Sequence, residues 1–121
     1  MAGILLVEDN DDLRMMLKAA LEKRRHVVVE ASNGREAVNK FKQSLDIVVT
    51  DILMPEQDGI GLIMEVKKLK PEIRIIAISG GGKISPSSYL DLAKTLGADA
   101  VFSKPFDLRN FISEVERLVA G

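Results

Sequence analysis

Five short runs rich in Ile, Val and Leu alternate along the chain with five segments whose apolar residues recur at helical spacing. Strands that helices cover on both faces are typically apolar throughout, whereas half-exposed strands alternate apolar and polar residues. The five runs cover residues 4–7, 27–29, 47–49, 73–78 and 98–102, and most of them are apolar throughout. Because connections between parallel strands are right-handed, the alternation predicts an α/β fold, a single doubly wound five-stranded parallel sheet in the order 2-1-3-4-5 with five helices.

The segments between these runs predict the helices. Apolar residues three and four apart mark them, within residues 13–21, 37–41, 63–69, 89–96 and 108–119. Residues at several ends support the helices, because Ser32-Asn33-Gly34 opens the second helix, Gly97 follows the fourth as a cap and Asp107 caps the start of the fifth. The longest irregular stretch, residues 79–88, includes three consecutive glycines and predicts a flexible lead into the fourth helix.

Length and composition indicate one cytoplasmic domain, residues 1–121. The 121 residues suffice for one core and are too few for two. The 17 Lys and Arg against 18 Asp and Glu leave a net charge of −1, which argues against direct binding to nucleic acid or to an anionic membrane. No apolar run reaches the ~20 residues of a membrane-spanning helix, and the N-terminus has no basic leader. The absence of cysteine and the single histidine, His26, exclude disulfides, zinc–thiolate sites and most histidine-based metal sites and triads.

Polar residues stand where four of the five predicted strands end. They are Glu8 and Asp9 after the first strand, Asp51 after the third, Ser79 after the fourth and Lys104 after the fifth. In doubly wound sheets, ligands bind beyond the carboxyl ends of the strands. Each residue has an ordinary structural explanation when taken alone; Asp9, for example, has the chemistry of a helix N-cap. Their coincidence at one edge of the sheet instead predicts a functional site.

Three carboxylates at one edge repel each other, and a divalent cation would relieve that repulsion. Carboxylate and carbonyl oxygens together with water suit Mg²⁺. A carboxylate can also act as a nucleophile toward a phosphoryl group, with a metal ion and a lysine neutralising the charge that develops on the phosphoryl oxygens. The residues therefore predict that Asp51 receives a phosphoryl group, while Lys104 and Ser79 bind its oxygens.

Further short motifs accompany these residues. They are Val7-Glu8-Asp9-Asn10, Met54-Pro55 and Asp58-Gly59 after Asp51, and Lys104-Pro105-Phe106. With them the sequence closely resembles, from residue 4 to about residue 118, the receiver domain of bacterial two-component response regulators. The resemblance implies the flavodoxin-like receiver fold and a phosphorelay function. It further implies a phosphohistidine donor on a histidine kinase or histidine phosphotransfer protein, an unidentified downstream effector, and compatibility with a homodimer that forms on phosphorylation.

The resemblance also implies a role for each site residue. Asp51 corresponds to the phosphoacceptor, and Mg²⁺ would be held by Asp51, by Asp9 directly, by Glu8 largely through water, and by the backbone carbonyl of Leu53. The remaining positions would act on the phosphoryl group: Ser79 as the switch hydroxyl, Gly80 through its backbone N–H, and Lys104 as the phosphate-binding cation. Pro105 would hold the following loop, often through a cis bond. Phosphorylation would then change a partner-binding surface around the fourth helix, fifth strand and fifth helix.

Three features depart from the usual receiver pattern. Val101 stands where an aromatic switch residue is common, and the neighbouring Phe102 is predicted to point to the opposite face of the sheet. The segment of residues 79–97 is about three residues longer than in compact receivers. Leu53 and Gly81 provide no polar group to orient an attacking water, which predicts slow self-dephosphorylation and no other enzymatic activity.

Other interpretations conflict with particular residues. A haloacid-dehalogenase-type phosphatase needs a second aspartate where Leu53 stands, and a flavodoxin needs a phosphate-binding first loop where this chain is acidic. A P-loop at residues 80–83 would need Gly and Ser or Thr where Ala77 and Ile84 stand. The alternative that remains is a phosphorylation-independent interaction domain on the same fold. Because the sequence stops at Gly121, just after the last helix, we expect no DNA-binding effector to follow, in either a stand-alone receiver or one excised from a larger regulator.

Overall fold

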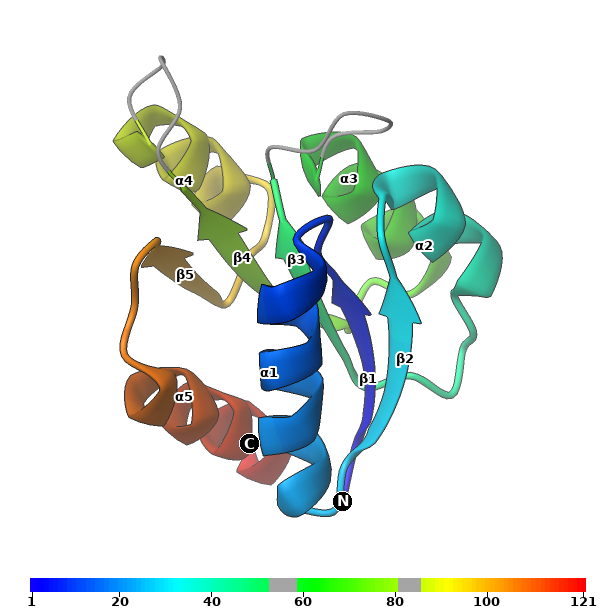
Figure 1. The fold of residues 1–121 in the computed structure, drawn as a ribbon. Helices are drawn as coiled ribbons and strands as arrows, with labels where there is room; N and C mark the ends of the chain where they lie inside the picture. The colour runs from blue at the N-terminus through cyan, green and yellow to red at the C-terminus, as the bar shows by residue number, and fades with distance from the viewer. Residues whose placement is uncertain (53–58, 81–85) are drawn as a thin grey trace.

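The five predicted strands form one parallel sheet in the order β2-β1-β3-β4-β5, as expected (Figure 1). The computed structural model describes residues 1–52, 59–80 and 86–121, without the side chains of residues 86–90. The strands are β1 (Gly3–Val7), β2 (Val27–Ala31), β3 (Ile47–Asp51), β4 (Arg74–Ser79) and β5 (Ala100–Ser103). The helices are α1 (Asp11–Lys23), α2 (Gly34–Lys40), α3 (Gly59–Leu69), α4 (Pro86–Thr95) and α5 (Leu108–Ala120).

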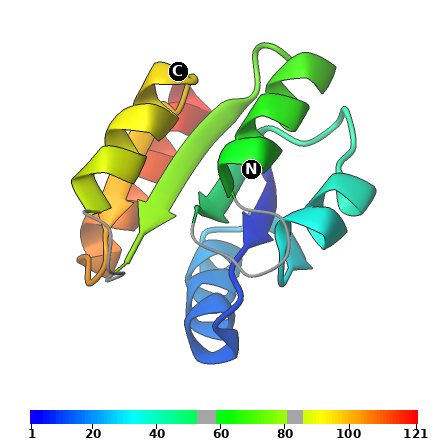
Figure 2. The same cartoon turned by 90° about the horizontal axis from the view of Figure 1, so that it is seen from above.

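Helices lie on both faces of the sheet (Figure 2). Between them and the sheet are two apolar cores, one on each face. Alternate residues of each strand enter opposite cores, so that Leu5 and Val7 pack with α2, α3 and α4, whereas Ile4 and Leu6 pack with α1 and α5. Burial on both faces explains why the strands are apolar throughout. None of the helices in the described part of the chain is long and apolar enough to cross a membrane.

The helices whose preceding residues are described, α1, α2 and α5, each begin at a residue whose side chain accepts a backbone N–H. Asp107 caps α5, as the sequence predicted, and Asn33, within the predicted opening of the second helix, caps α2. At α1 the cap is Asn10, whose side chain accepts the N–H of Leu13 at 2.9 Å. The capping role considered for Asp9 is therefore filled by its neighbour.

One predicted boundary that the structure corrects is the start of β5. This strand begins at Ala100 and not at residue 98, because the N–H of Ala98 bonds to the carbonyl of Ala93 at the end of α4. Gly97 has a φ of +113°, which turns the chain out of the helix as its predicted capping role requires. At the other boundary of interest, β3 continues to Asp51, which pairs with Ile78 and is therefore part of the sheet.

Phe111 of α5 is expected to be a principal contributor to stability. Its ring is fully buried, with centroids 5.9 Å from Phe102 and 5.7 Å from Phe106. Phe111→Ala should lower the free energy of unfolding by about 3–5 kcal/mol, because it removes apolar area and leaves a cavity. Denaturant unfolding measures the change, with Met64→Ala on the exposed face of α3 as a control expected within about 0.5 kcal/mol of wild type. A loss below about 1 kcal/mol for Phe111→Ala would contradict this assignment.

Candidate functional site

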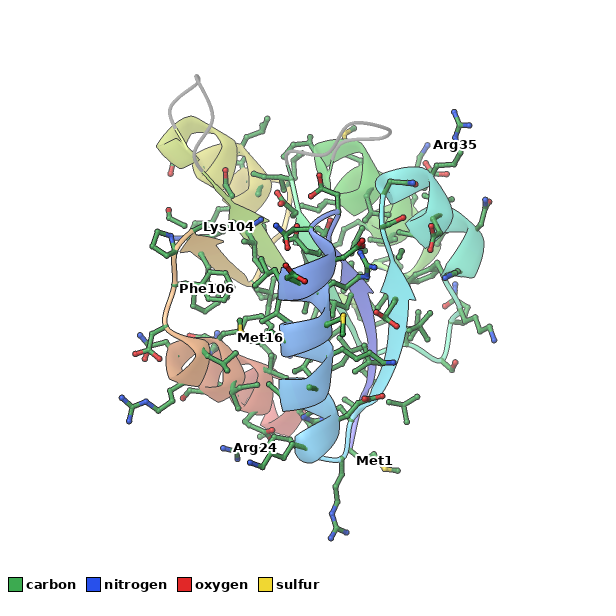
Figure 3. The ribbon with its side chains drawn as sticks, in the orientation of Figure 1. Met1, Met16, Arg24, Arg35, Lys104 and Phe106 are labelled. Carbon is green, nitrogen blue, oxygen red and sulfur yellow. The ribbon has the colours of Figure 1, made fainter. Side chains whose placement is uncertain are left out.

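The predicted site residues lie at the carboxyl edge of the sheet. Asp51 and Ser79 are the last residues of β3 and β4, and Glu8 and Lys104 directly follow β1 and β5. Because all strand pairs are parallel, their carboxyl ends share one edge. Lys104 lies near this end of the sheet in Figure 3.

Three carboxylates converge there. Glu8, Asp9 and Asp51 each offer an oxygen, and these atoms lie within 4.8 Å of one another. Glu8 and Asp51 are only 1% and 4% exposed, whereas Asp9 is exposed. Two carboxylates of the cluster are thus buried and the third faces solvent, so a ligand could enter from the side of Asp9.

Lys104 bridges the two buried carboxylates. Its Nζ lies 2.7 Å from Asp51 Oδ2 and 2.9 Å from Glu8 Oε1. The backbone supports this reach, because the N–H of Lys104 donates to the carbonyl of Ser79 at 2.7 Å. The following Lys104–Pro105 peptide bond is cis. Gly80 leaves room for the lysine, since a Cβ on Gly80 would lie 2.6 Å from Lys104 Cδ.

Burial and charge shift the titration of this cluster. Burial, reinforced by the charge of Asp51, raises the pKa of Glu8 above its ordinary value, although the N–H of Asn10 and the Lys104 ammonium partly offset the effect. For Lys104, burial works to lower the pKa, but the hydrogen bond to Asp51 and the negative charges of Asp51 and Glu8 outweigh it and raise the pKa. The lysine therefore remains a cation, held by the acids it partly neutralises.

Two buried polar atoms in the described part of the chain lack a hydrogen-bond partner, and both are in this site. One is Ser79 Oγ, on a fully buried residue. The other is Glu8 Oε1, which is close enough to Lys104 Nζ for an ion pair but not aligned for a hydrogen bond. Buried polar groups are nearly always satisfied in native proteins, so these atoms indicate a ligand that is added in the working state. Carboxylate oxygens suit a hard cation such as Mg²⁺, and a hydroxyl suits an anion beside it.

The loop after Asp51 can be described only at its ends. Leu53, expected to contribute a backbone carbonyl, lies outside the described residues, as do Met54, Pro55 and Asp58. Gly59 closes the loop, since its N–H donates to the carbonyl of Ile52 at 3.2 Å. A Cβ on Gly59 would overlap the backbone of Asp51 and Ile52, so the end of β3 can approach α3 only because this residue is glycine.

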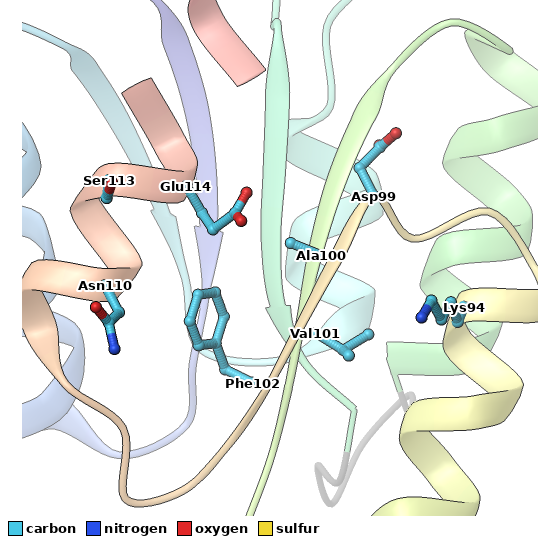
Figure 4. Close-up of a pocket in the computed structure, with 8 residues that line it drawn as sticks. All are labelled: Lys94, Asp99, Ala100, Val101, Phe102, Asn110, Ser113 and Glu114. Atoms are coloured by element: carbon cyan, nitrogen blue, oxygen red, sulfur yellow. The ribbon is translucent and has the colours of Figure 1, made fainter. Parts of the chain in front are cut away.

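Val101 and Phe102 point to opposite faces of the sheet, as predicted (Figure 4). Val101 packs with the core under α4, and Phe102 packs with the core under α5. No aromatic side chain therefore occupies the β5 position on the α4 side. The predicted lengthening before α4 falls mainly on residues 81–85, which lie outside the described residues.

Sequence reasoning overlooked one residue that contacts the site. Arg14 on α1 donates from Nη1 to the backbone carbonyl of Glu8 at 2.8 Å. Arg14 follows Asp11 by three residues on a helix, and that spacing could have predicted only the ion pair between these two side chains. Nothing in that spacing indicated that the guanidinium folds back over the loop.

Lys104→Met is expected to destabilise the metal-free protein by about 2–3 kcal/mol at about pH 7, because it leaves two buried carboxylates facing each other. The loss should shrink toward about pH 5. Since the pKa of Glu8 is raised in the folded state, the folded protein takes up a proton more readily than the unfolded chain, and stability is recovered as the pH falls. Denaturant unfolding at both pH values tests this. Lys94→Met, an exposed lysine of α4, is the control, and equal losses for both variants would refute the explanation.

Comparison with known proteins supplies the family. The family model for the response regulator receiver domain matches residues 4–116. The response regulator receiver protein CpdR of Brucella abortus is 36% identical over 98% of this chain and 98% of its own. The chemotaxis protein CheY of Thermotoga maritima is 38% identical over 95% of each chain. The chain also matches the sensor kinase CckA of Brucella abortus, at 38% identity, but covers only 12% of that protein.

Solved structures agree with the sequence relatives. A response regulator receiver domain from Clostridium thermocellum superposes with a TM-score of 0.89 at 27% identity, over 99% of this chain and 95% of that one. The response regulator TrrA of Thermotoga maritima, in complex with Mg²⁺-BeF, superposes with a TM-score of 0.83 at 31% identity, over 98% and 99% of the two chains. In sequence, sheet order and site composition alike, the chain belongs to the receiver-domain family of two-component response regulators.

Proposed function

We propose that Asp51 is the phosphoacceptor of this receiver domain and that Glu8, Asp9 and Asp51, with the carbonyl of Leu53, hold Mg²⁺ beside it. Accepting a phosphoryl group is the function of the receiver family, and receiver domains bind Mg²⁺ in an acidic pocket. The observation that carries the assignment to these residues is the convergence of three carboxylates within 4.8 Å at the carboxyl edge of the sheet. The alternative of a phosphorylation-independent interaction domain is not favoured by the family match.

Each neighbour of Asp51 has a role in the proposed transfer. Asp51 attacks the phosphorus of a phosphohistidine, so that a P–O bond forms as the P–N bond breaks and the imidazole leaves. Mg²⁺, when bound, supplies positive charge to the phosphoryl oxygens. Lys104 lies 2.7 Å from Asp51 Oδ2. It is therefore placed to bind one oxygen of the phosphoryl group, which carries the negative charge once the carboxylate of Asp51 is esterified.

The unsatisfied hydroxyl of Ser79 provides the second contact. Ser79 Oγ is buried and has no hydrogen-bond partner among the residues that the structure describes, so a phosphoryl oxygen would meet a donor with no competing bond from them. The backbone N–H of Gly80, the next residue, would be a further donor. This new hydrogen bond at the end of β4 is the proposed start of the conformational change that follows phosphorylation.

The proposed output surface includes β5, the strand that pairs with β4. A hollow of ≈ 360 Å³ opens between α4, β5 and α5 (Figure 4), lined among others by Lys94, Val101, Phe102 and Asn110. We propose this face as the site where phosphorylation changes partner binding, in a protein that acts in the cytoplasm. A histidine kinase or phosphotransfer protein would be the donor. A homodimer would be one form of the phosphorylated state.

Phosphorylation with a small donor tests the assignment. Incubation with acetyl phosphate and Mg²⁺ should increase the intact mass by one phosphoryl group, whereas Asp51→Asn should show no increase because the nucleophilic oxygen is lost. Asp91→Asn, an exposed aspartate of α4, is the matched control and should be labelled like wild type. An unmodified wild-type protein, or labelling of Asp51→Asn to the same extent, would overturn the proposal.

Slow self-dephosphorylation remains a prediction from the sequence. Leu53 and Gly81 both lie outside the described residues, and neither side chain can orient a water molecule toward the acyl phosphate. Leu53→Asn should therefore accelerate the decay of the phosphorylated protein, followed by intact mass after the donor is removed, while Leu53→Met should leave the decay unchanged. Wild-type decay within seconds, or no acceleration in Leu53→Asn, would contradict the prediction.

A further inference from the structure

Arg14 joins the loop that carries Glu8 and Asp9 to the rest of the fold. Its guanidinium makes three contacts: Nη1 donates to the carbonyl of Glu8 at 2.8 Å, Nη2 to Asp11 Oδ1 at 2.7 Å, and Nε to Glu30 Oε1 at 3.3 Å. The side chain is only 16% exposed. It therefore connects three separate segments, namely the β1–α1 loop, the first turn of α1 and the end of β2.

The contact with the carbonyl of Glu8 orients the peptide unit between Glu8 and Asp9. A peptide unit is planar, so fixing its carbonyl also fixes the two Cα atoms from which the side chains project. On the other side of Glu8, the backbone N–H donates to the carbonyl of Ala31 at 3.0 Å. Glu8 is thus held by β2 through its N–H and by Arg14 through its carbonyl.

The two acids of the loop depend on this peptide to different degrees. The carboxylate of Glu8 has a second restraint, because its Oε2 accepts the N–H of Asn10 at 3.0 Å. The carboxylate of Asp9 makes no hydrogen bond or ion pair with any described residue. Among the described residues its position is therefore restrained only through the backbone that carries it, and Arg14 holds one carbonyl of that backbone.

We propose that Arg14 is a positioning residue of the metal pocket: by holding the carbonyl of Glu8, it aims the carboxylate of Asp9 at the ligand. This inference rests on the proposed function, in which Asp9 binds Mg²⁺. Groups that orient metal ligands from outside the coordination shell typically change metal affinity by about 10–100-fold when they are removed. Arg14→Ala should accordingly weaken Mg²⁺ binding by about tenfold.

The direction in which Arg14→Ala changes Mg²⁺ affinity distinguishes a positioning role from a purely electrostatic one. Arg14 is a cation close to a cation-binding pocket, so removing its charge would strengthen Mg²⁺ binding if Coulomb repulsion were the main effect. Lys18 provides a matched comparison, because it lies on the same helix and pairs with the same Glu30, at 3.3 Å, but makes no contact with the loop. Lys18→Ala should leave the affinity within about twofold of wild type.

The experiment is a Mg²⁺ titration followed by NMR chemical shifts, with no phosphoryl donor present. Arg14→Ala is expected to raise the Kd about tenfold, and Arg14→Lys, which keeps the charge and can reach one acceptor only, about threefold. An Arg14→Ala affinity within about twofold of wild type, or an equal loss in Lys18→Ala, would overturn the inference. If circular dichroism shows that Arg14→Ala does not fold, the Kd values of Arg14→Lys and Lys18→Ala are compared instead. A Kd of Arg14→Lys within about twofold of wild type, or an equal loss in Lys18→Ala, would then overturn the inference.

A double variant tests whether Arg14 acts through Asp9. In an Asp9→Asn background, Arg14→Ala should change the Kd by less than about twofold, because the carboxylate that it positions is already gone. The same tenfold loss in both backgrounds would show a general structural effect and would refute the inference. Failure of the proposed function gives a different result, since wild type itself would then bind no Mg²⁺ or Asp9→Asn would bind it as wild type does.

Discussion

Repulsion among the three carboxylates at the carboxyl edge of the sheet is the constraint on which the site depends. Glu8 and Asp51 are buried, and the Lys104 ammonium lies 2.9 Å from Glu8 Oε1 and 2.7 Å from Asp51 Oδ2. Ser79 Oγ, at the same edge, has no hydrogen-bond partner among the described residues. A cation would relieve the repulsion among the carboxylates, and a phosphoryl oxygen beside it would accept the hydrogen bond of the hydroxyl.

The sheet supports this site because its central strands are buried on both faces. Strands covered on both faces have little freedom to shift, so their ends can hold like charges close together. Glycines complete the arrangement where side chains would intrude. Gly59 allows α3 to approach the end of β3, and Gly80 leaves space for the aliphatic part of Lys104. On the far side of the loop, Arg14 holds the carbonyl of Glu8.

Much of this could be predicted from the sequence, and the errors have physical causes. The continuous apolar runs and the residues at their ends located the strands and placed Glu8, Asp51, Ser79 and Lys104 at one edge. The start of β5 was predicted two residues early, because Ala98 is apolar yet bonds to the end of α4. The cap that Asp9 could have supplied to α1 is supplied by Asn10, because both residues have the chemistry and only geometry selects between them.

The sequence by itself determined the alternation of strands and helices and the polar residues at the strand ends, because strand burial and helical periodicity are local patterns; the strand order was expected only as the common arrangement for that alternation. Only the tertiary structure decided that Lys104 bridges Glu8 and Asp51, that the Ser79 hydroxyl has no partner among the described residues and that Arg14 reaches back to the β1–α1 loop. These contacts join residues distant in the chain through side chains that can reach several partners. Their choice follows from packing, which no local pattern encodes.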